Sequence, residues 1–252
     1  QAPASLDHPN VIRVIDAFVL DGGQPAIVMD RLEGEPLNEL FKRVEVLPVG
    51  VLAALAVPVL EAVAAAHDKG LVHRDLKPGN LFLARRGGRV TPVVLDFGLV
   101  KLMGSSQTGL RTQPGTALGT PAYMAPEQAR GETLGPPADV WAMGVVLYRG
   151  LSGMLPIEGA DLADLITRLA RQAILPLSEL EPDLPSDVAS LVMRMLDKDP
   201  HARPRAHEAA GILRPYADAA ALASMARARD GRDDDAASLP TAPTVQASLP
   251  TA

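Results

Sequence analysis

The chain has 252 residues, which is long enough for one large domain or two small ones with a buried core. Its formal net charge of −6 argues against a nucleic-acid partner, because proteins that neutralise phosphates are usually basic. The absence of cysteine excludes disulfide scaffolds, thiolate zinc sites, iron–sulfur clusters and cysteine nucleophiles.

No membrane segment is expected within these residues. The opening residues lack the basic and apolar regions of a signal peptide. The longest apolar run, Val46–Leu60, is interrupted by prolines and is too short to cross a bilayer, so it indicates a buried helix. We therefore expect a cytoplasmic location for this part of the protein, with any membrane anchor outside it.

The first hundred residues combine short strands with two helices. Two segments rich in Val and Ile, Val11–Leu20 and Ala26–Leu32, flank Asp21-Gly22-Gly23, and this pattern predicts a β-hairpin with a glycine turn. The elements expected next, in chain order, are a short helix over Glu35–Arg43, an alanine-rich helix over Val51–Asp68, a loop with short extended pieces over Leu71–Leu83 and a strand over Val90–Leu95.

The second half is predicted to be helical after a long loop. Residues 99–138 hold many glycines and prolines and show little periodicity, which predicts a long loop, and such loops in compact domains are usually functional. Helices are then expected over Ala138–Leu151, Leu162–Ala173, Pro185–Leu196 and Ala206–Leu213. Strands followed by helices indicate an α+β fold.

The composition changes after Arg214. Residues 215–252 are rich in Ala, Asp, Pro, Ser and Thr, and the hexapeptide Ala-Ser-Leu-Pro-Thr-Ala stands at 237–242 and again at 247–252. Such a segment buries too little apolar surface to offset its ordering entropy. We expect a disordered tail over 215–252, in which residues 216–229 have the composition of a fraying helix.

Three short motifs carry the chemical signal. His73-Arg74-Asp75-Leu76-Lys77-Pro78-Gly79-Asn80 matches the H-R-D-L-x-x-x-N pattern of a phosphoryl-transfer catalytic loop. Asp96-Phe97-Gly98 follows a predicted strand, and Ala125-Pro126-Glu127 comes after it in the expected order. From about Leu6 to Leu213 the chain resembles the eukaryotic-type (Hanks-type) protein kinases, in their bacterial Ser/Thr branch. The resemblance implies a protein-kinase-like α+β fold and transfer of the γ-phosphoryl group of ATP to Ser or Thr of protein substrates, with Mg²⁺.

The resemblance also implies a role for each catalytic-loop residue. Asp75 would accept the proton of the substrate hydroxyl, and Lys77 would reach the transferring phosphate. Asn80 and Asp96 offer the hard oxygen ligands that Mg²⁺ prefers. Taken alone, Asp75 is typical of a surface or capping aspartate and Asn80 of a turn residue, so it is their joint spacing that favours catalysis.

The end of the second predicted strand resembles the hinge between the two lobes of a kinase. By this resemblance Met29 occupies the gatekeeper position, and backbone groups of Asp30 and Leu32 would bond to adenine. Phe82 would form the floor under the adenine ring, a role that coincides with plain core packing.

Regulatory roles follow from the same resemblance. Arg74 would bind a phosphate on the activation loop by charge-assisted contacts. Among the loop hydroxyls, Thr112 and Thr116 are the preferred acceptors, and modification by a second copy of the chain in a homodimer is the expected route. The hydroxyl of Thr120 would bond to Asp75 and Lys77.

Five further residues are expected to hold the fold together rather than to react. His73 would stack with Phe97, and Glu127 would form a buried ion pair with Arg203, which is costly to break. Asp139 is placed to cap a helix, and by the resemblance it would anchor the catalytic-loop backbone; the two roles are compatible.

Several parts of an intact kinase have no counterpart in these residues. There is no glycine-rich phosphate loop, and the first lysine is Lys42, so the lysine of the third small-lobe strand has no match. We expect residues 1–32 to be a remnant of the small lobe with its last two strands and the hinge, and residues 33–214 to be the large lobe.

The preferred interpretation is a piece of a working kinase with little activity by itself. The first alternative is a catalytically inactive, pseudokinase-like binding or regulatory module. The second is a small-molecule phosphotransferase, against which Arg74 and Ala125–Glu127 argue.

Overall fold

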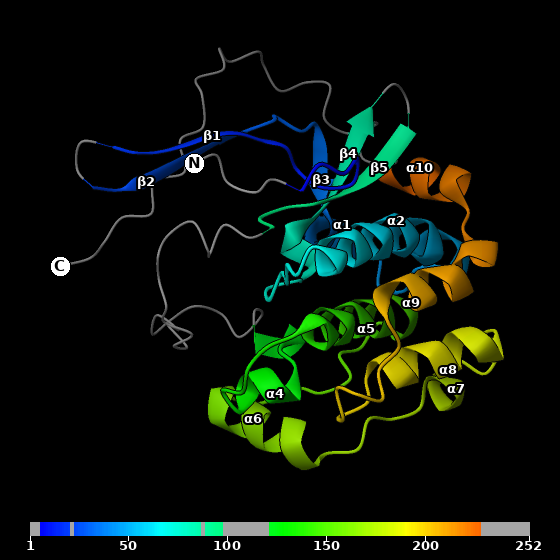
Figure 1. Ribbon diagram of the computed structural model, residues 1–252. Helices are drawn as coiled ribbons and strands as arrows, with labels where there is room; N and C mark the ends of the chain where they lie inside the picture. Colours follow the sequence, from blue (N-terminus) through cyan, green and yellow to red (C-terminus); the bar gives the residue numbers. More distant parts are fainter. Residues whose placement is uncertain (1–5, 21–22, 87–88, 98–120, 228–252) are drawn as a thin grey trace.

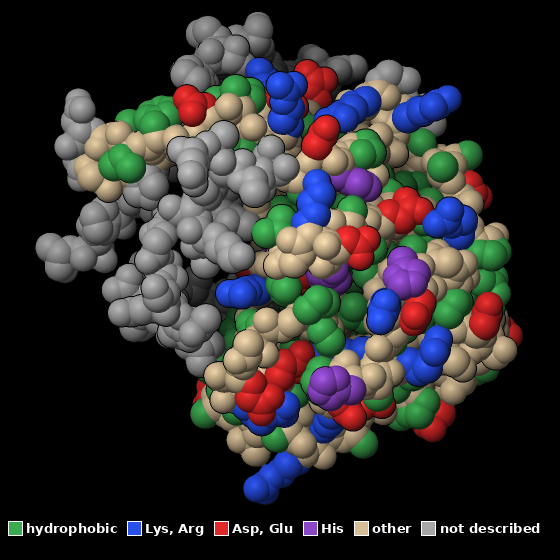
Figure 2. Space-filling model, in the orientation of Figure 1, with side chains coloured by type: hydrophobic (Ala, Val, Ile, Leu, Met, Phe, Trp, Pro, Cys, Tyr) green, Lys and Arg blue, Asp and Glu red, His purple; other side chains and the backbone are tan. Residues whose placement is uncertain are grey.

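The computed structural model describes residues 6–20, 23–86, 89–97 and 121–227. The predicted hairpin is confirmed: β1 (Val14–Val19) pairs with β2 (Pro25–Met29) in antiparallel register, with Phe18 opposite Ala26. The hairpin projects away from the helical body in Figure 1, and hydrophobic side chains lie on its surface in Figure 2. Among them, Ile15 is 59% exposed and Val19 is 68% exposed.

A second sheet of three strands lies over the helices. Its order is β3 (Gly34–Pro36), β4 (Leu81–Arg86) and β5 (Arg89–Val94), all antiparallel. Only β5 was predicted as a strand, whereas the first half of β4, Leu81–Leu83, was assigned to the end of a loop with short extended pieces. The expectation that a helix covers Glu35 and Pro36 is wrong, because these residues pair with β4 and the helix α1 (Leu37–Arg43) begins after them.

Gly34 shows why β3 can approach β4 so closely. Its φ of +138° disfavours any residue with a side chain, and a Cβ there would lie 2.0 Å from the carbonyl oxygen of Leu83. The pairing of this three-residue strand therefore depends on a glycine and on β4, which lies far along the chain. No hydrophobic periodicity in the local sequence predicts it.

The core is built around one apolar helix, α2 (Val49–Asp68), which packs against α5 (Pro136–Ser152), α9 (Ala206–Leu213) and β5. Within the described ranges, α2 is the one helix long and apolar enough by composition to cross a membrane, and 67% of its apolar window is buried inside the fold. A helix that is apolar all round is typical of a protein core. The remaining elements are η1 (Pro78–Asn80), η2 (Pro121–Tyr123), α4 (Pro126–Ala129), α6 (Leu162–Arg171), α7 (Leu177–Leu180), α8 (Ser186–Met195), η3 (Arg214–Tyr216) and α10 (Ala219–Arg227).

The six predicted helices are confirmed within two residues at each end. The expected loop 99–138 is interrupted by η2, α4 and the first residues of α5, while residues 98–120 lie outside the described residues. The four-residue helix α7 was missed because it is too short to show a helical period.

The expectation that the tail begins at residue 215 is wrong for residues 215–227. The helix α10 packs against α2 and β5 (Figure 1), and it buries Leu222 (1% exposed) and Ala226 (2% exposed). The backbone N–H of Asp218 donates to the carbonyl of Gly50 at 2.9 Å and fixes the start of this helix against α2. The alanine-rich composition predicted only a fraying helix, and burial against α2 stabilises it. Residues 228–252 lie outside the described residues.

We expect Leu222→Ala to lower the free energy of unfolding by about 2–3 kcal/mol, because it removes a buried side chain from the contact between α10 and α2. The exposed neighbour Ser224 is the control, and Ser224→Ala should leave stability within about 0.5 kcal/mol. Urea denaturation measures both. Equal stability of the two variants would show that α10 does not belong to the cooperative fold.

Candidate active site

The carboxylate of Asp139 holds the catalytic loop in place. Asp139 lies in the first turn of α5 and is 1% exposed. Its Oδ1 accepts the N–H of Arg74 at 2.8 Å, and its Oδ2 accepts the N–H of His73 at 2.9 Å. The ring Nε2 of His67 lies 2.9 Å from the same Oδ2. Of the two roles expected for Asp139, the anchor is present, and the helix cap is wrong because Gly135 caps α5.

Two residues of the motifs hold an unusual backbone conformation. Arg74 has a φ of +69° and Asp96 a φ of +59°, and they are the two non-glycine residues with positive φ in the described part of the chain. Left-handed backbone in such residues is uncommon and persists where the surroundings impose it. For Arg74 the hydrogen bond from its N–H to Asp139 supplies that constraint.

His73 links the catalytic loop to the end of β5. Its Nε2 lies 2.8 Å from the carbonyl oxygen of Leu95, so Nε2–H donates, and its Nδ1 accepts the N–H of Asp75 at 3.3 Å. The ring meets Phe97 edge-on, with centroids 4.8 Å apart and an interplanar angle of 73°. The predicted pairing of His73 with Phe97 is therefore confirmed, with an edge contact rather than a parallel stack.

The side chains of Lys77 and Asn80 both donate to the carboxylate of Asp75. Lys77 Nζ donates to Asp75 Oδ2 at 2.8 Å. Asn80 Nδ2 donates to the backbone carbonyl of Asp75 at 2.7 Å and to its Oδ2 at 3.1 Å. The Asp75 side chain remains 50% exposed, so its carboxylate is accessible from solvent.

A backbone hydrogen bond brings the chain at Asp96 close to Asn80, although the two residues are 16 positions apart. The N–H of Leu95 donates to the carbonyl of Asn80 at 2.9 Å and brings the next residue, Asp96, beside the loop. The amide N–H₂ of Asn80 donates to Asp75, and no hydrogen bond to its Oδ1 occurs among the described residues. One amide oxygen and one exposed carboxylate suit a hard cation that takes its other ligands from phosphate and water.

The residues expected at the nucleotide form a small apolar cluster of their own. Met29, Leu32 and Phe82 pack together around Ile12, Ala84 and Val93, apart from the main core. The N–H of Asp30 donates to the carbonyl of Arg13 at 3.0 Å. The N–H of Leu32 has no hydrogen-bond partner within the described residues and is available to a ligand.

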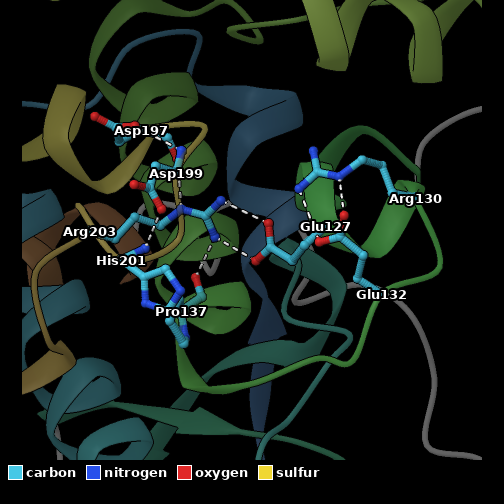
Figure 3. A network of polar contacts seen from close by, with 8 residues as sticks. All are labelled: Glu127, Arg130, Glu132, Pro137, Asp197, Asp199, His201 and Arg203. Atoms are coloured by element: carbon cyan, nitrogen blue, oxygen red, sulfur yellow. Dashed lines mark hydrogen bonds and ion pairs between the residues drawn. The ribbon is translucent and has the colours of Figure 1, made fainter.

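A buried ion pair supports the segment that follows the activation loop (Figure 3). Arg203 Nη1 and Nη2 donate to Glu127 Oε1 and Oε2 at 2.7 and 2.8 Å, which confirms the predicted pair. Arg203 Nη1 also donates to the carbonyl of Pro137, and Nε donates to that of Asp197, so four of the five N–H groups of the guanidinium are satisfied. Its charge lies 5.0 Å from the centre of the Trp141 ring.

Three contributors to the site were not predicted. His67 contacts the Asp139 carboxylate, Leu95 bonds through its backbone to both His73 and Asn80, and Gln128 Nε2 donates to the carbonyl of Arg74 at 3.2 Å. Backbone partners carry no signal in a sequence, and a histidine or glutamine at these positions has no local pattern to mark it. Thr112, Thr116 and Thr120 lie outside the described residues.

We expect Arg203→Met to lower the free energy of unfolding by about 3–5 kcal/mol, because the carboxylate of Glu127 is then buried without a partner. Arg130→Met is the matched control, since Arg130 pairs with Glu132 at the surface nearby (Figure 3) and its loss should change stability little. Chemical denaturation of both variants and the wild type measures these changes in the free energy of unfolding. A change no larger for Arg203→Met than for Arg130→Met would contradict a stabilising role of the buried pair.

Comparison with known proteins agrees with this geometry. The sequence matches the protein kinase domain family over residues 1–212. It is 38% identical over 213 residues to the serine/threonine-protein kinase pkn2 of Myxococcus xanthus, covering 83% of this chain and 25% of that protein. It is 34% identical over 228 residues to the serine/threonine-protein kinase PknA of Mycobacterium tuberculosis, covering 89% of this chain and 49% of that protein.

A solved structure shows the same fold. The kinase domain of PknI from Mycobacterium tuberculosis superposes with a TM-score of 0.63 at 27% identity, covering 85% of this chain and 75% of that one. The chain spans between a quarter and a half of the length of the curated relatives pkn2 and PknA. The anchored catalytic loop, the carboxylate at the end of β5 and the buried Glu127–Arg203 pair therefore occur together in a chain that belongs to the protein kinase domain family, in its bacterial serine/threonine branch.

Proposed function

We propose that this domain transfers the γ-phosphoryl group of ATP to Ser or Thr hydroxyls of protein substrates. The observation that carries the proposal is the convergence of Lys77 and Asn80 on the half-exposed carboxylate of Asp75, with Asp96 alongside. The names of the relatives, which are serine/threonine-protein kinases, support this choice of substrate class.

In this proposal Asp75 orients the acceptor. Its carboxylate accepts a hydrogen bond from the Ser or Thr hydroxyl and takes its proton as the new bond from oxygen to the γ-phosphorus forms. The bond between that phosphorus and the bridging oxygen breaks, and ADP leaves. Lys77, held 2.8 Å from Asp75, places a positive charge where the transferred oxygens carry negative charge.

The donor set fits Mg²⁺, for which Asn80 Oδ1 and the Asp96 carboxylate are the proposed protein ligands. When bound, the ion neutralises charge on the phosphates. Leu95 contributes by positioning, because its backbone bonds to Asn80 and His73 fix Asp96 relative to the catalytic loop.

The apolar cluster is the proposed adenine site. Met29 and Leu32 lie where the hairpin meets the helical body, and Phe82 lies on β4 across the same cluster. The carbonyl of Asp30 and the N–H of Leu32 would bond to the adenine edge.

We divide the chain accordingly into a small-lobe portion over residues 1–32 and a large lobe from residue 33. Because α10 packs on the large lobe, its end moves from residue 214 to residue 227. Dependence on ATP places the domain in the cytoplasm in this proposal.

Arg74 is the proposed receptor for a regulatory phosphate. Its side chain is exposed and makes no ion pair with another described residue, while its backbone is fixed by Asp139 and Gln128. Phosphorylation of Thr112 or Thr116 by a second copy would supply a partner for this charge. The Thr120 hydroxyl is proposed to bond to Asp75 and Lys77.

Asp75→Asn tests the catalytic role. In the longest in-frame chain that the gene encodes, we expect this variant to transfer phosphate at least about 100-fold more slowly, because an amide cannot accept the proton. The dissociation constant of Mg·ATP should change less than about twofold, because Asp75 faces the acceptor. Radiolabelled transfer to a mixed Ser/Thr peptide pool and equilibrium nucleotide binding measure the two quantities.

The control is Asp183→Asn, an exposed carboxylate between α7 and α8 far from the motifs in sequence, which should transfer like the wild type. Undiminished transfer by Asp75→Asn would remove Asp75 from the mechanism. Nucleotide binding without any transfer by the wild-type protein would favour the alternative of a binding module.

A further inference from the structure

A pocket of about 330 Å³ opens where the C-terminal end of α2 meets the N-terminal ends of α5 and α9. In the fold, α2 packs against both of these helices (Figure 1). The volume falls in the range of small-molecule sites. None of the residues proposed for catalysis or for adenine binding borders this pocket. One wall of it is apolar and is formed by Ala64, Pro136, Pro137, Val140 and Pro204.

His67 links this pocket to the anchor of the catalytic loop. Its ring borders the pocket, and its Nε2 lies 2.9 Å from Oδ2 of Asp139, the carboxylate that also accepts the backbone N–H groups of His73 and Arg74. Because an ionised carboxylate only accepts hydrogen bonds, Nε2–H of His67 is the donor. Two hydrogen bonds in series therefore connect the pocket to the backbone of the catalytic loop.

The second ring nitrogen of His67 is available to a ligand. The side chain is only 10% exposed, and Nδ1 has no hydrogen-bond partner among the described residues. The fully buried side-chain atoms without a partner in those residues are Asn38 Oδ1 and Trp141 Nε1, so Nδ1 of His67 reaches the accessible surface that the pocket provides. This nitrogen accepts a hydrogen bond when the ring is neutral and donates one when the ring is protonated.

The polar rim of the pocket offers donors to a negative group. Arg205 and His207 are exposed, and they border the pocket from the residue before α9 and from the first turn of that helix. Together with protonated His67, they supply one guanidinium and two imidazoles. The N-terminal ends of α5 and α9 add partial positive charge. Glu208, in the same turn of α9, is engaged by the backbone N–H of Arg205 at 3.1 Å.

The negative charges around the pocket favour a ligand with a single charge. Asp68 is the one acidic residue that borders the pocket in the described part of the chain, and it is exposed. The C-terminal end of α2 acts in the same sense. Arg203 adds no net charge, because its guanidinium is paired with Glu127. A small cationic excess of this kind suits a carboxylate better than a phosphate dianion.

We propose that this pocket binds a small organic carboxylate and that the bound molecule stabilises the catalytic loop through His67 and Asp139. The carboxylate accepts a hydrogen bond from Nδ1–H of protonated His67, and Arg205 pairs with its charge. The apolar body of the ligand packs against the proline and aliphatic wall. Since Nε2–H stays on Asp139, the imidazolium joins the ligand to the residue that fixes the loop. The site is separate from the proposed active site, and its test needs no phosphoryl transfer.

Benzoate is the probe, and isothermal titration calorimetry on the longest in-frame chain that the gene encodes measures its binding. For a ligand of this size we expect a dissociation constant of about 1 mM. Benzyl alcohol, which has the same ring but no charge, should bind at least about tenfold more weakly. Benzoate keeps its charge between about pH 8 and about pH 6, whereas an imidazole gains a proton in that interval, so binding should be tighter at the lower pH.

Two variants locate the site. His67→Gln loses Nδ1 but keeps an amide that can donate to Asp139, and it should weaken benzoate binding about tenfold. Ala64→Met fills the apolar side of the pocket and should abolish binding. His201→Gln is the matched control, because His201 is an exposed histidine near Arg203 that does not border the pocket, and it should bind like the wild type. Should His67→Gln fail to fold, Ala64→Met decides.

Hydrogen exchange tests the link to the catalytic loop, because the N–H groups of His73 and Arg74 are the ones held by Asp139. At a benzoate concentration about ten times the dissociation constant, their exchange should slow by up to about tenfold in the wild type and not in Ala64→Met. Exchange in α8, which does not border the pocket, controls for a general gain in stability.

Three results would overturn the inference. The first is benzoate binding that is absent from the wild type or unchanged in both His67→Gln and Ala64→Met. The second is equal affinity for benzoate and benzyl alcohol, and the third is exchange at His73 and Arg74 that saturating benzoate leaves unchanged.

Discussion

The hydrogen bonds of Asp139 are the constraint on which the candidate active site depends. A carboxylate that is 1% exposed is costly to bury unless its oxygens find donors. Here the donors are the backbone N–H groups of His73 and Arg74, so satisfying the carboxylate also fixes the catalytic loop. The left-handed backbone of Arg74 persists because this bond opposes its relaxation.

Two parts of the site meet on α5. Its first turn carries the anchor Asp139, and Trp141 lies under the guanidinium that pairs with Glu127. Because α5 is almost wholly buried against α2 and α8, these two positions are held at a fixed distance from one another. A rigid helix therefore supports both the catalytic loop and the segment after the activation loop.

The end of β5 positions the proposed metal ligands, as α5 positions the catalytic loop. Leu95 uses both of its backbone groups, one toward Asn80 and one toward His73, and the chain then turns through the left-handed residue Asp96. The side chain of Leu95 packs in the apolar cluster that contains Met29, Leu32 and Phe82. The proposed nucleotide and metal sites therefore share one short strand, and a shift of β5 would disturb both.

The sequence by itself determined the chemistry and most of the helices. The spacing within His73–Asn80 and the order of the motifs around Asp96 and Glu127 are local facts, and an amphipathic or apolar helix shows its period in a single window. Tertiary structure alone decided the pairing of β3, the burial of α10 and the choice between the two roles expected for Asp139. Each of these depends on a partner far along the chain, 66 residues away for Asp139 and His73, and a local pattern cannot record which distant groups packing will bring together.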